Sequence, residues 1–198
     1  MPAASTTECD LYLRGDTGAL RQIDGSSNDN AVLGWQGGVV YRSLAASTAL
    51  TASSTETALD SYTIPANTLK AGSVIRVRFQ GIATATNSTD TLTVKLYIGG
   101  LSGTAVLTGT ATDATNNDIV TGEALIVLRT IGASGTFVAT ASGNIVPAAT
   151  RVAVPVFQIT ASTTLDTTAA VDLTIGYKWS TTSGSNSCRN DIFVVEIF

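Results

Sequence analysis

The sequence predicts an all-β protein in which two antiparallel sheets pack face to face, preceded by an N-terminal arm. From residue 58 onward, apolar and polar residues alternate with a period of two, and no stretch repeats its apolar residues at the helical spacing. Threonine occurs 32 times among 198 residues, and a composition so rich in β-branched residues favours strands over helices. A chain of this length is expected to form one domain, with or without an appendage.

Residues 1–45 are expected to form the arm. Their apolar runs, such as Leu11–Leu13 and Val39–Tyr41, are only a few residues long and are separated by Asp, Asn, Ser and Gly, which favour turns. Hairpins this short bury too little surface to be stable alone, so the arm should become ordered against another protein. Because Trp, Tyr and Arg dominate binding hot spots, we expect contacts with a partner from Tyr12, Arg14, Arg21, Trp35, Tyr41 and Arg42.

Residues 46–57 lack aromatic residues and strong periodicity, which is typical of a linker or a weak edge strand. Residues 58–198 are expected to form the sandwich. Alternation is clearest in residues 91–98 and 171–180, and residues 75–80 follow the same pattern. Further strands are expected at residues 58–64, 104–108, 119–130, 136–141, 151–159 and 189–197. About nine strands suit a two-sheet sandwich, but the sequence leaves their order open.

Some strands carry apolar residues whose role is open. Tyr177 and Trp179 share one face of their strand, which indicates core residues, with a sugar-stacking platform as the alternative. Ala124–Arg129 and Asp191–Phe198 are apolar on both faces, so something other than solvent should cover the second face. The cover is either a loop of the same chain or another subunit around a symmetry axis. The residues expected at such a subunit interface are Leu125, Val127, Phe193, Val195 and Ile197.

The charge content narrows the choice of partners. Lys and Arg number 11 against 15 Asp and Glu, which gives a net charge of −4 without any basic stripe or cluster. This pattern disfavours binding to nucleic acid or to an anionic membrane. Only 13% of the residues are charged, so part of the apolar surface should be covered by copies of the chain or by a partner. The expected partners are proteins or glycans.

The sequence offers little support for an enzyme. It contains no histidine, which removes the usual general base and the commonest zinc ligand and so excludes Ser/His/Asp and Cys/His catalysis. No phosphate-binding or nucleophile motif occurs, so we assign no catalytic residue and expect no cofactor. Asp113, Asn116, Asn117, Asp118 and Glu123 form an oxygen-rich loop without the spacing of an EF-hand. We expect a solvated turn there rather than a calcium site or a glycosidase-like pair.

The cysteine content and the lack of targeting signals indicate where the protein is made, and two short motifs are interpreted accordingly. Cys9 and Cys188 are too few for a disulfide framework and are expected to be free thiols. The N-terminus lacks the pattern of a signal peptide, and no stretch reaches the apolar length of a membrane span, so we expect folding in a cytosol. There the glycosylation sequon at Asn87 should stay unmodified. Arg14-Gly15-Asp16 is interpreted as a tight turn rather than an integrin-binding motif.

One long stretch resembles the opening of the jelly-roll domain in structural proteins of tailed-bacteriophage virions. It is LDSYTIPANTLKAGSVIRVRFQGIATATNSTDTLTVKLYIGG, residues 59–100, with a strand ending in TIPANTL, a Gly turn, a long strand with a central Gly and a second strand ending in YIGG. The last strand after SNSCR (residues 185–189) resembles that group too. ALRQIDG (residues 19–25) and VLGWQGGVVYR (residues 32–42) resemble the N-terminal attachment segments of phage head-decoration and fibre proteins.

The resemblance implies an antiparallel jelly-roll β-sandwich with an extended N-terminal arm. It further implies a homotrimer on the outer capsid surface of a virion, assembled in the host cytoplasm and tethered through the arm. The implied function is that of a capsid decoration (cement) protein, whose partners are its own copies and the major capsid protein. The alternative is a receptor- or glycan-binding fibre or spike protein of a phage virion, whose loops contact a host-surface glycan.

Overall fold

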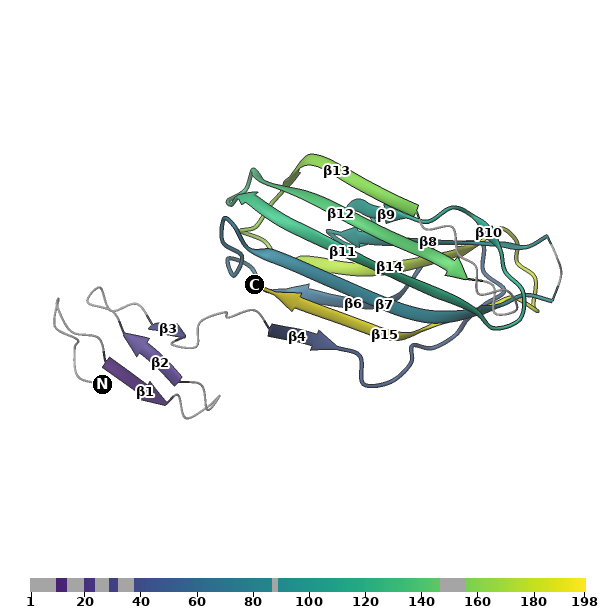
Figure 1. Cartoon of the computed structure of the whole chain (residues 1–198), viewed down its shortest axis with the longest axis horizontal. Coiled ribbons are helices and arrows are strands. Elements are labelled where there is room, and N and C mark those ends of the chain that lie inside the picture. The colour runs from purple at the N-terminus through teal and green to yellow at the C-terminus, as the bar shows by residue number, and fades with distance from the viewer. Residues whose placement is uncertain (1–9, 14–19, 24–28, 32–37, 87–88, 147–155) are drawn as a thin grey trace. The chain divides into compact units, whose positions relative to one another are not determined.

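The computed structural model describes residues 10–13, 20–23, 29–31, 38–86, 89–146 and 156–198 (Figure 1). Of residues 10–31 and of Val156, only the backbone is described. The chain divides near Gly38 into two compact units, which we call the N-terminal unit and the body. All regular structure in the described segments is β-strand, as the sequence predicts. None of these segments contains a helix long and apolar enough to cross a membrane.

The N-terminal unit contains a three-stranded antiparallel sheet with β2 in the middle. Its strands are β1 (Asp10–Leu13), β2 (Leu20–Ile23) and β3 (Asp29–Ala31). In the register of this sheet Arg21 lies opposite Tyr12 on one side and Ala31 on the other. Each strand is at most four residues long, in agreement with the short apolar runs of the sequence.

The body is built from two sheets. The five-stranded sheet contains β6 (Thr57–Ile64), β8 (Thr91–Ile98), β9 (Thr104–Thr108), β10 (Thr112–Asp113) and β14 (Val171–Trp179). The seven-stranded sheet contains β4 (Gly38–Arg42), β5 (Leu50–Thr51), β7 (Val74–Thr84), β11 (Asp118–Thr130), β12 (Gly135–Val146), β13 (Val156–Leu165) and β15 (Ser187–Ile197).

The strand order is that of a jelly roll. The larger sheet runs β13-β12-β11-β7-β15-β4, and the smaller one runs β10-β8-β14-β6 with β9 also paired to β8. Four neighbouring pairs, β4 with β15, β6 with β14, β7 with β11 and β8 with β9, therefore join the first part of the body to the second. Such nested pairing is the double Greek key of a jelly roll. The predicted jelly-roll sandwich is confirmed, and β12 and β13 extend its larger sheet (Figure 1).

The core lies between the two sheets and is formed within one chain. Alternate residues of each strand are buried, because successive side chains of a strand point to opposite faces. Among the largest fully buried side chains are Trp179, Tyr177, Phe137 and Phe193. Burying an apolar side chain of this kind contributes about 1.5–3 kcal/mol relative to leaving it exposed. Tyr177 and Trp179 are therefore core residues, and the sugar-stacking alternative is excluded because neither ring is accessible.

Some boundaries differ from those expected. β4 is a strand of the body sheet beside β15, so the body starts near Gly38, earlier than the expected residue 58. Residues 46–57, expected as a linker or weak edge strand, include β5, and Ser47 bonds to the backbone of Asn190 both through its N–H (2.8 Å) and through its Oγ (2.9 Å). Small side chains without an apolar period gave no sign of this pairing. Of the strand expected at 151–159, residues 151–155 lie outside the described part, and β13 runs from Val156 to Leu165.

Candidate functional site

Exposed apolar side chains gather on the outer face of the seven-stranded sheet, where β11, β12 and β13 lie side by side. The register places Leu125 opposite Thr140 and Thr140 opposite Ile159, while Ser142 lies opposite Phe157. All five residues are directed away from the core, and we call them the β11–β13 surface. It lies at one edge of the sheet, since β13 pairs only with β12 among the described strands.

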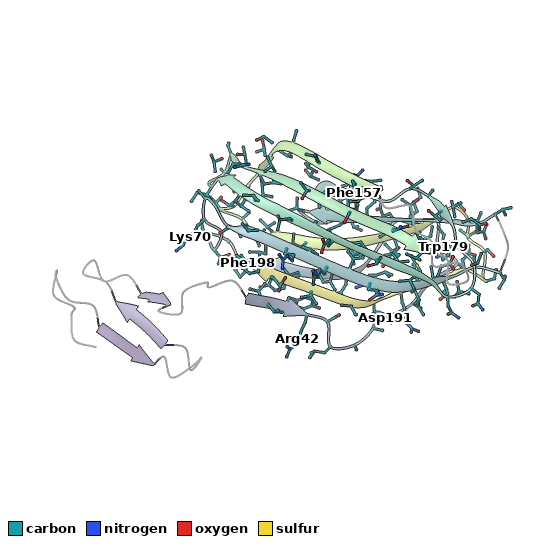
Figure 2. All side chains as sticks on the ribbon, in the orientation of Figure 1. Arg42, Lys70, Phe157, Trp179, Asp191 and Phe198 are labelled. Atoms are coloured by element: carbon teal, nitrogen blue, oxygen red, sulfur yellow. The ribbon has the colours of Figure 1, made fainter. Side chains whose placement is uncertain are left out.

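Two apolar side chains of β13, Phe157 and Ile159, are highly exposed. Phe157 is 77% exposed and Ile159 is 84% exposed, while Leu125 on β11 is 39% exposed. The residue between them, Gln158, points the other way, and its Oε1 accepts a hydrogen bond from the backbone N–H of Thr108 on β9. Because this bond connects β13 to the opposite sheet, alternation directs Phe157 and Ile159 outward. Figure 2 shows the position of Phe157.

A hollow of about 450 Å³ adjoins these side chains. Phe157 and Ile159 line it from β13, Thr140 and Ser142 from β12, and Leu125 from β11. Because small side chains on β12 separate large ones on β11 and β13, the outer face is recessed along the middle strand. The β11–β13 surface therefore has a projecting apolar ridge, Phe157 and Ile159, beside a recess of mixed lining that also includes Arg76 and Glu123.

Charge is scarce on this part of the protein. Between residues 130 and 165 the sequence contains one charged residue, Arg151, which lies outside the described residues. Two ion pairs lie on the neighbouring strands: Arg78 Nε lies 3.2 Å from Glu123 Oε2, and Arg76 Nη1 lies 3.4 Å from Glu196 Oε2. Exposed pairs of this kind add little stability. Arg76 and Glu123 also line the hollow, so both charged residues in its lining are paired within the chain.

Tyr41, an expected partner contact of the arm, is instead packed on the body. Its ring stacks on Tyr62 with centroids 5.2 Å apart and meets the edge of Phe193 at 5.9 Å. The Tyr41 hydroxyl donates a hydrogen bond to Asp60 Oδ1 at 3.2 Å. Tyr41 therefore connects β4 to β6 and β15, and because it is only partly buried its contact with a partner stays a prediction. Arg42, the next residue, is exposed and remains a predicted contact.

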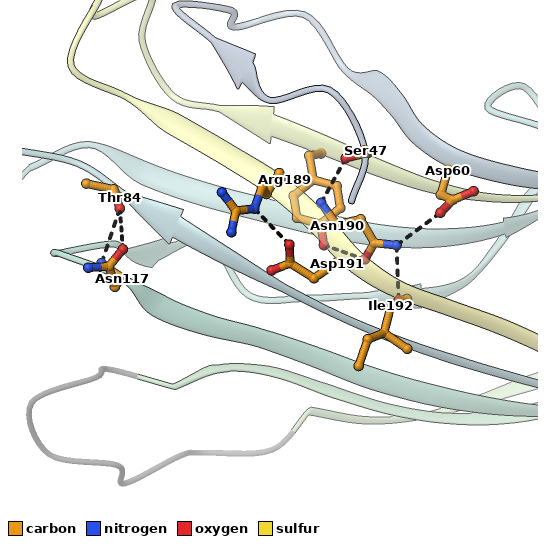
Figure 3. A network of polar contacts seen from close by, with 9 residues as sticks. Ser47, Asp60, Thr84, Asn117, Arg189, Asn190, Asp191 and Ile192 are labelled. Carbon is orange, nitrogen blue, oxygen red and sulfur yellow. Dashed lines mark hydrogen bonds and ion pairs between the residues drawn. The ribbon is translucent and has the colours of Figure 1, made fainter. Parts of the chain in front are cut away.

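Asn190 continues this polar network into the core (Figure 3). Its Nδ2 donates to Asp60 Oδ2 at 3.4 Å and to the backbone oxygen of Ile192 at 3.1 Å, and its Oδ1 accepts from the buried Tyr177 hydroxyl at 3.4 Å. Burial raises the pKa of Asp60, and the hydrogen bonds that it accepts from Tyr41 and Asn190 oppose this rise. The network joins four strands and has no access to a substrate-sized cavity among the described ones, so its role is structural.

The expected subunit interface requires a correction. Phe193, Val195 and Ile197 are at most 1% exposed and lie in the core of a single chain, so they are not available to another subunit. The sequence of β15 is apolar on both faces because Ile192 and Val194 occupy its outer face. Leu125 and Val127 do point outward from β11, and their place in a subunit interface stays a prediction.

The other predicted arm contacts lie beyond what the structure describes. Arg14 and Trp35 fall outside the described residues, as do Arg14-Gly15-Asp16 as a whole and Asn87 of the glycosylation sequon. Tyr12 lies on β1 and Arg21 on β2, where the backbone alone is described. The backbones of these two residues lie opposite each other in the register of β1 and β2. All four remain predicted contacts.

The acidic loop is not a solvated turn throughout, as the sequence suggested, because Asp118 is buried. Asp118 is fully buried and accepts hydrogen bonds from Thr115, through the backbone N–H at 2.8 Å and the hydroxyl at 2.9 Å. Asp113 belongs to β10 in the smaller sheet, while Glu123 is paired with Arg78 on the larger one. Within the described segments, no three His, Cys, Asp or Glu residues are grouped as a metal site would require.

Cys188 is a buried free cysteine, as the sequence predicts, whereas Cys9 lies outside the described residues. Burial raises the pKa of the Cys188 thiol to about 12. Since the thiolate is the reactive form of cysteine, this thiol is inert at neutral pH.

The alternation of residues in β13 indicates that part of the β11–β13 surface is apolar. Phe157 and Ile159 alternate with Gln158 and Thr160, which shows that the two apolar residues share a face. The usual interpretation places an apolar face in the core. Only the register of β13 beside β12 and the bond of Gln158 to β9 reveal that this face points outward.

Three solved structures show what the chain is similar to. The VP2 subviral particle of infectious bursal disease virus matches at 13% identity and a TM-score of 0.37 over 96% of this chain and 38% of that chain. Lectin I-B4 from Griffonia simplicifolia, in its metal-free form, matches at 10% identity and 0.28 over 96% and 92%. Infectious bursal disease virus of the Gx strain matches at 15% identity and 0.24 over 94% and 43%.

This chain spans less than half the length of the two viral chains. All three TM-scores are low, so these similarities assign no function. No protein-family model matches the sequence, and no curated protein matches it.

Proposed function

We propose that this protein is a capsid decoration protein of a virion, in which three jelly-roll bodies associate and the N-terminal units bind the major capsid protein on the outer surface of the head. The observation that supports this proposal is an exposed apolar surface, with the charges in its lining paired within the chain, on a body whose core is already complete. Exposed apolar patches of this kind mark interaction sites in soluble proteins. The resemblance of the sequence to structural proteins of phage virions indicates which type of assembly this surface serves.

The division of the chain suits such a role. The N-terminal unit is a small sheet of its own, separated from the body by a boundary near Gly38. In a trimer, attachment of one such unit makes attachment of the second and third effectively intramolecular. Weak individual contacts would then give stable decoration of a capsid without any catalytic group.

Removal of residues 1–37 tests this division of labour while leaving β4 in the body sheet. We expect the truncated chain to associate as the full-length protein does, but to fail to co-sediment with isolated capsids that lack the protein. Full-length protein is the positive control, and it should saturate the capsids. Undiminished capsid binding by the truncated chain would contradict the proposed role of the N-terminal unit.

A glycan array separates this function from that of a receptor-binding fibre or spike. The decoration protein should bind no carbohydrate reproducibly. Reproducible glycan binding by the full-length protein, together with no binding to capsids, would replace the proposal with the fibre or spike alternative.

A further inference from the structure

We infer that copies of this chain associate through the β11–β13 surface, with Phe157 and Ile159 of one copy entering the recess of the next. The inference rests on the proposed function, because it identifies where the bodies of the decoration trimer meet. It also replaces the buried part of the interface that the sequence suggested with residues that are accessible in the folded chain.

The accessibility of the ridge is the first step. Phe157 and Ile159 leave most of their side-chain surface in water, and Leu125 adds a third apolar group across the recess. Large apolar anchors that bury themselves in a partner's pocket carry most of the binding energy of protein interfaces. Three apolar groups surround the recess, with polar Thr140 and Ser142 between them, and the charged Arg76 and Glu123 in its lining are paired within the chain, so the apolar groups can serve as anchors.

The shape of the surface indicates the occupant. Phe157 and Ile159 project from the wall of the recess on the same chain, so a second copy offers a recess for this ridge and a third copy a ridge for this recess. When each copy inserts its ridge into the recess of the next, the contact is of the head-to-tail type that closes into a ring if the rotation between copies allows it. Three copies around an axis are the closed ring that the proposed function requires.

The charges point to the same occupant. The described parts of β12 and β13 carry no charged side chain, and the nearest charges are already paired as Arg78 with Glu123 and Arg76 with Glu196. Two copies can therefore meet here without burying an unpaired charge, which would be costly. A strongly charged partner would find no opposite charge on β12 or β13. With a net charge of −4 per chain, copies repel one another weakly, so an uncharged contact is the one that favours association.

Sedimentation equilibrium of the full chain and two sets of variants tests the inference. The first variant is Phe157→Thr with Ile159→Thr, which places β-branched residues, favourable in strands, at both positions. The second set is a matched pair, Leu125→Ser and Leu101→Ser. Leu101 is as exposed as Leu125, at 39%, but it lies in the turn after β8 of the smaller sheet. Circular dichroism and thermal unfolding establish that each variant is folded.

We expect the wild type and Leu101→Ser to remain trimeric, while the β13 double variant dissociates at a concentration about 30-fold higher or more. Leu125→Ser should shift the equilibrium in the same direction. If the double variant and Leu125→Ser associate as tightly as the wild type, the inference is wrong and the proposed trimer must use another surface. If the double variant stays trimeric but no longer binds capsids, the surface contacts the capsid instead of another copy.

A wild-type protein that is monomeric would overturn both the inference and the proposed trimer. Capsid binding by such a monomer would still leave the attachment role of the N-terminal unit in place. The truncation of residues 1–37 therefore tests the attachment role of the N-terminal unit, and the surface variants separately test the contact between bodies.

Discussion

Asp60 is a partly buried carboxyl group whose environment differs between the folded and the unfolded chain. It lies on β6 beside the Tyr41 hydroxyl and the Asn190 side-chain amide. Burial raises its pKa above the usual 3.8, because a carboxylate loses hydration there. The folded state therefore binds this proton more tightly than the unfolded chain does. The stability contributed by the protonated group is fully present below the unfolded pKa and is lost as the pH rises through the folded pKa.

Asp60→Asn tests this assignment, because asparagine does not titrate and its carbonyl still accepts a hydrogen bond from Tyr41. From urea unfolding at a series of pH values, we expect the wild type to lose stability relative to the variant as the pH is raised from below 3.8 towards neutral. Asp166→Asn is the control of opposite sign, since hydrogen bonds from Thr168 lower the pKa of Asp166. A wild-type-minus-Asp60→Asn difference that is flat across this range would show that Asp60 is not desolvated.

At the scale of the element, β13 is positioned by one polar contact with the opposite sheet. Gln158 Oε1 accepts the hydrogen bond of the Thr108 N–H on β9. Replacing Gln158 by Met keeps the length of the side chain and removes the acceptor. We expect Gln158→Met to lower the free energy of unfolding by about 1–3 kcal/mol, because the Thr108 N–H loses its partner. Thr136→Val, on the outer face of β12, is the control: it removes only the solvent-exposed hydrogen bond between the Thr136 and Thr130 hydroxyls and should change stability little.

The measurement is the urea midpoint at constant slope. An unchanged midpoint for Gln158→Met would indicate that water replaces the bond without cost and that other contacts hold β13. A lower midpoint with the same slope is the expected result.

The elements themselves could be predicted to within a few residues where one face is buried. Residues 91–98 and 104–108 match β8 and β9, because alternating apolar residues record which face meets the core. β4 was missed as a body strand, and the segment that holds β5 was left as a linker or a weak edge strand, since the pairing of both strands with β15 depends on backbone hydrogen bonds. Local sequence carries no information on such long-range pairing.

The candidate site was predictable only in part. The two-faced apolar pattern of β11 correctly placed Leu125 on the outer face, but the same pattern on β15 failed for Phe193, Val195 and Ile197, which belong to the core. Apolar content shows that a strand has two apolar faces and does not show which face is already covered. For Phe157 and Ile159 the deciding fact was a side-chain contact between sheets, which only the fold provides.

At the scale of the whole molecule, the low charge and the exposed apolar ridge lead to one expectation, that this chain acts as an assembly. A mass of 20.3 kDa per chain gives about 61 kDa for three copies. Sedimentation equilibrium of the full-length wild type at micromolar concentration measures this mass directly. The proposed decoration protein should give a single species of three chains. A single species of one chain, unchanged as the concentration is raised, would contradict the claim that the bodies work as a trimer.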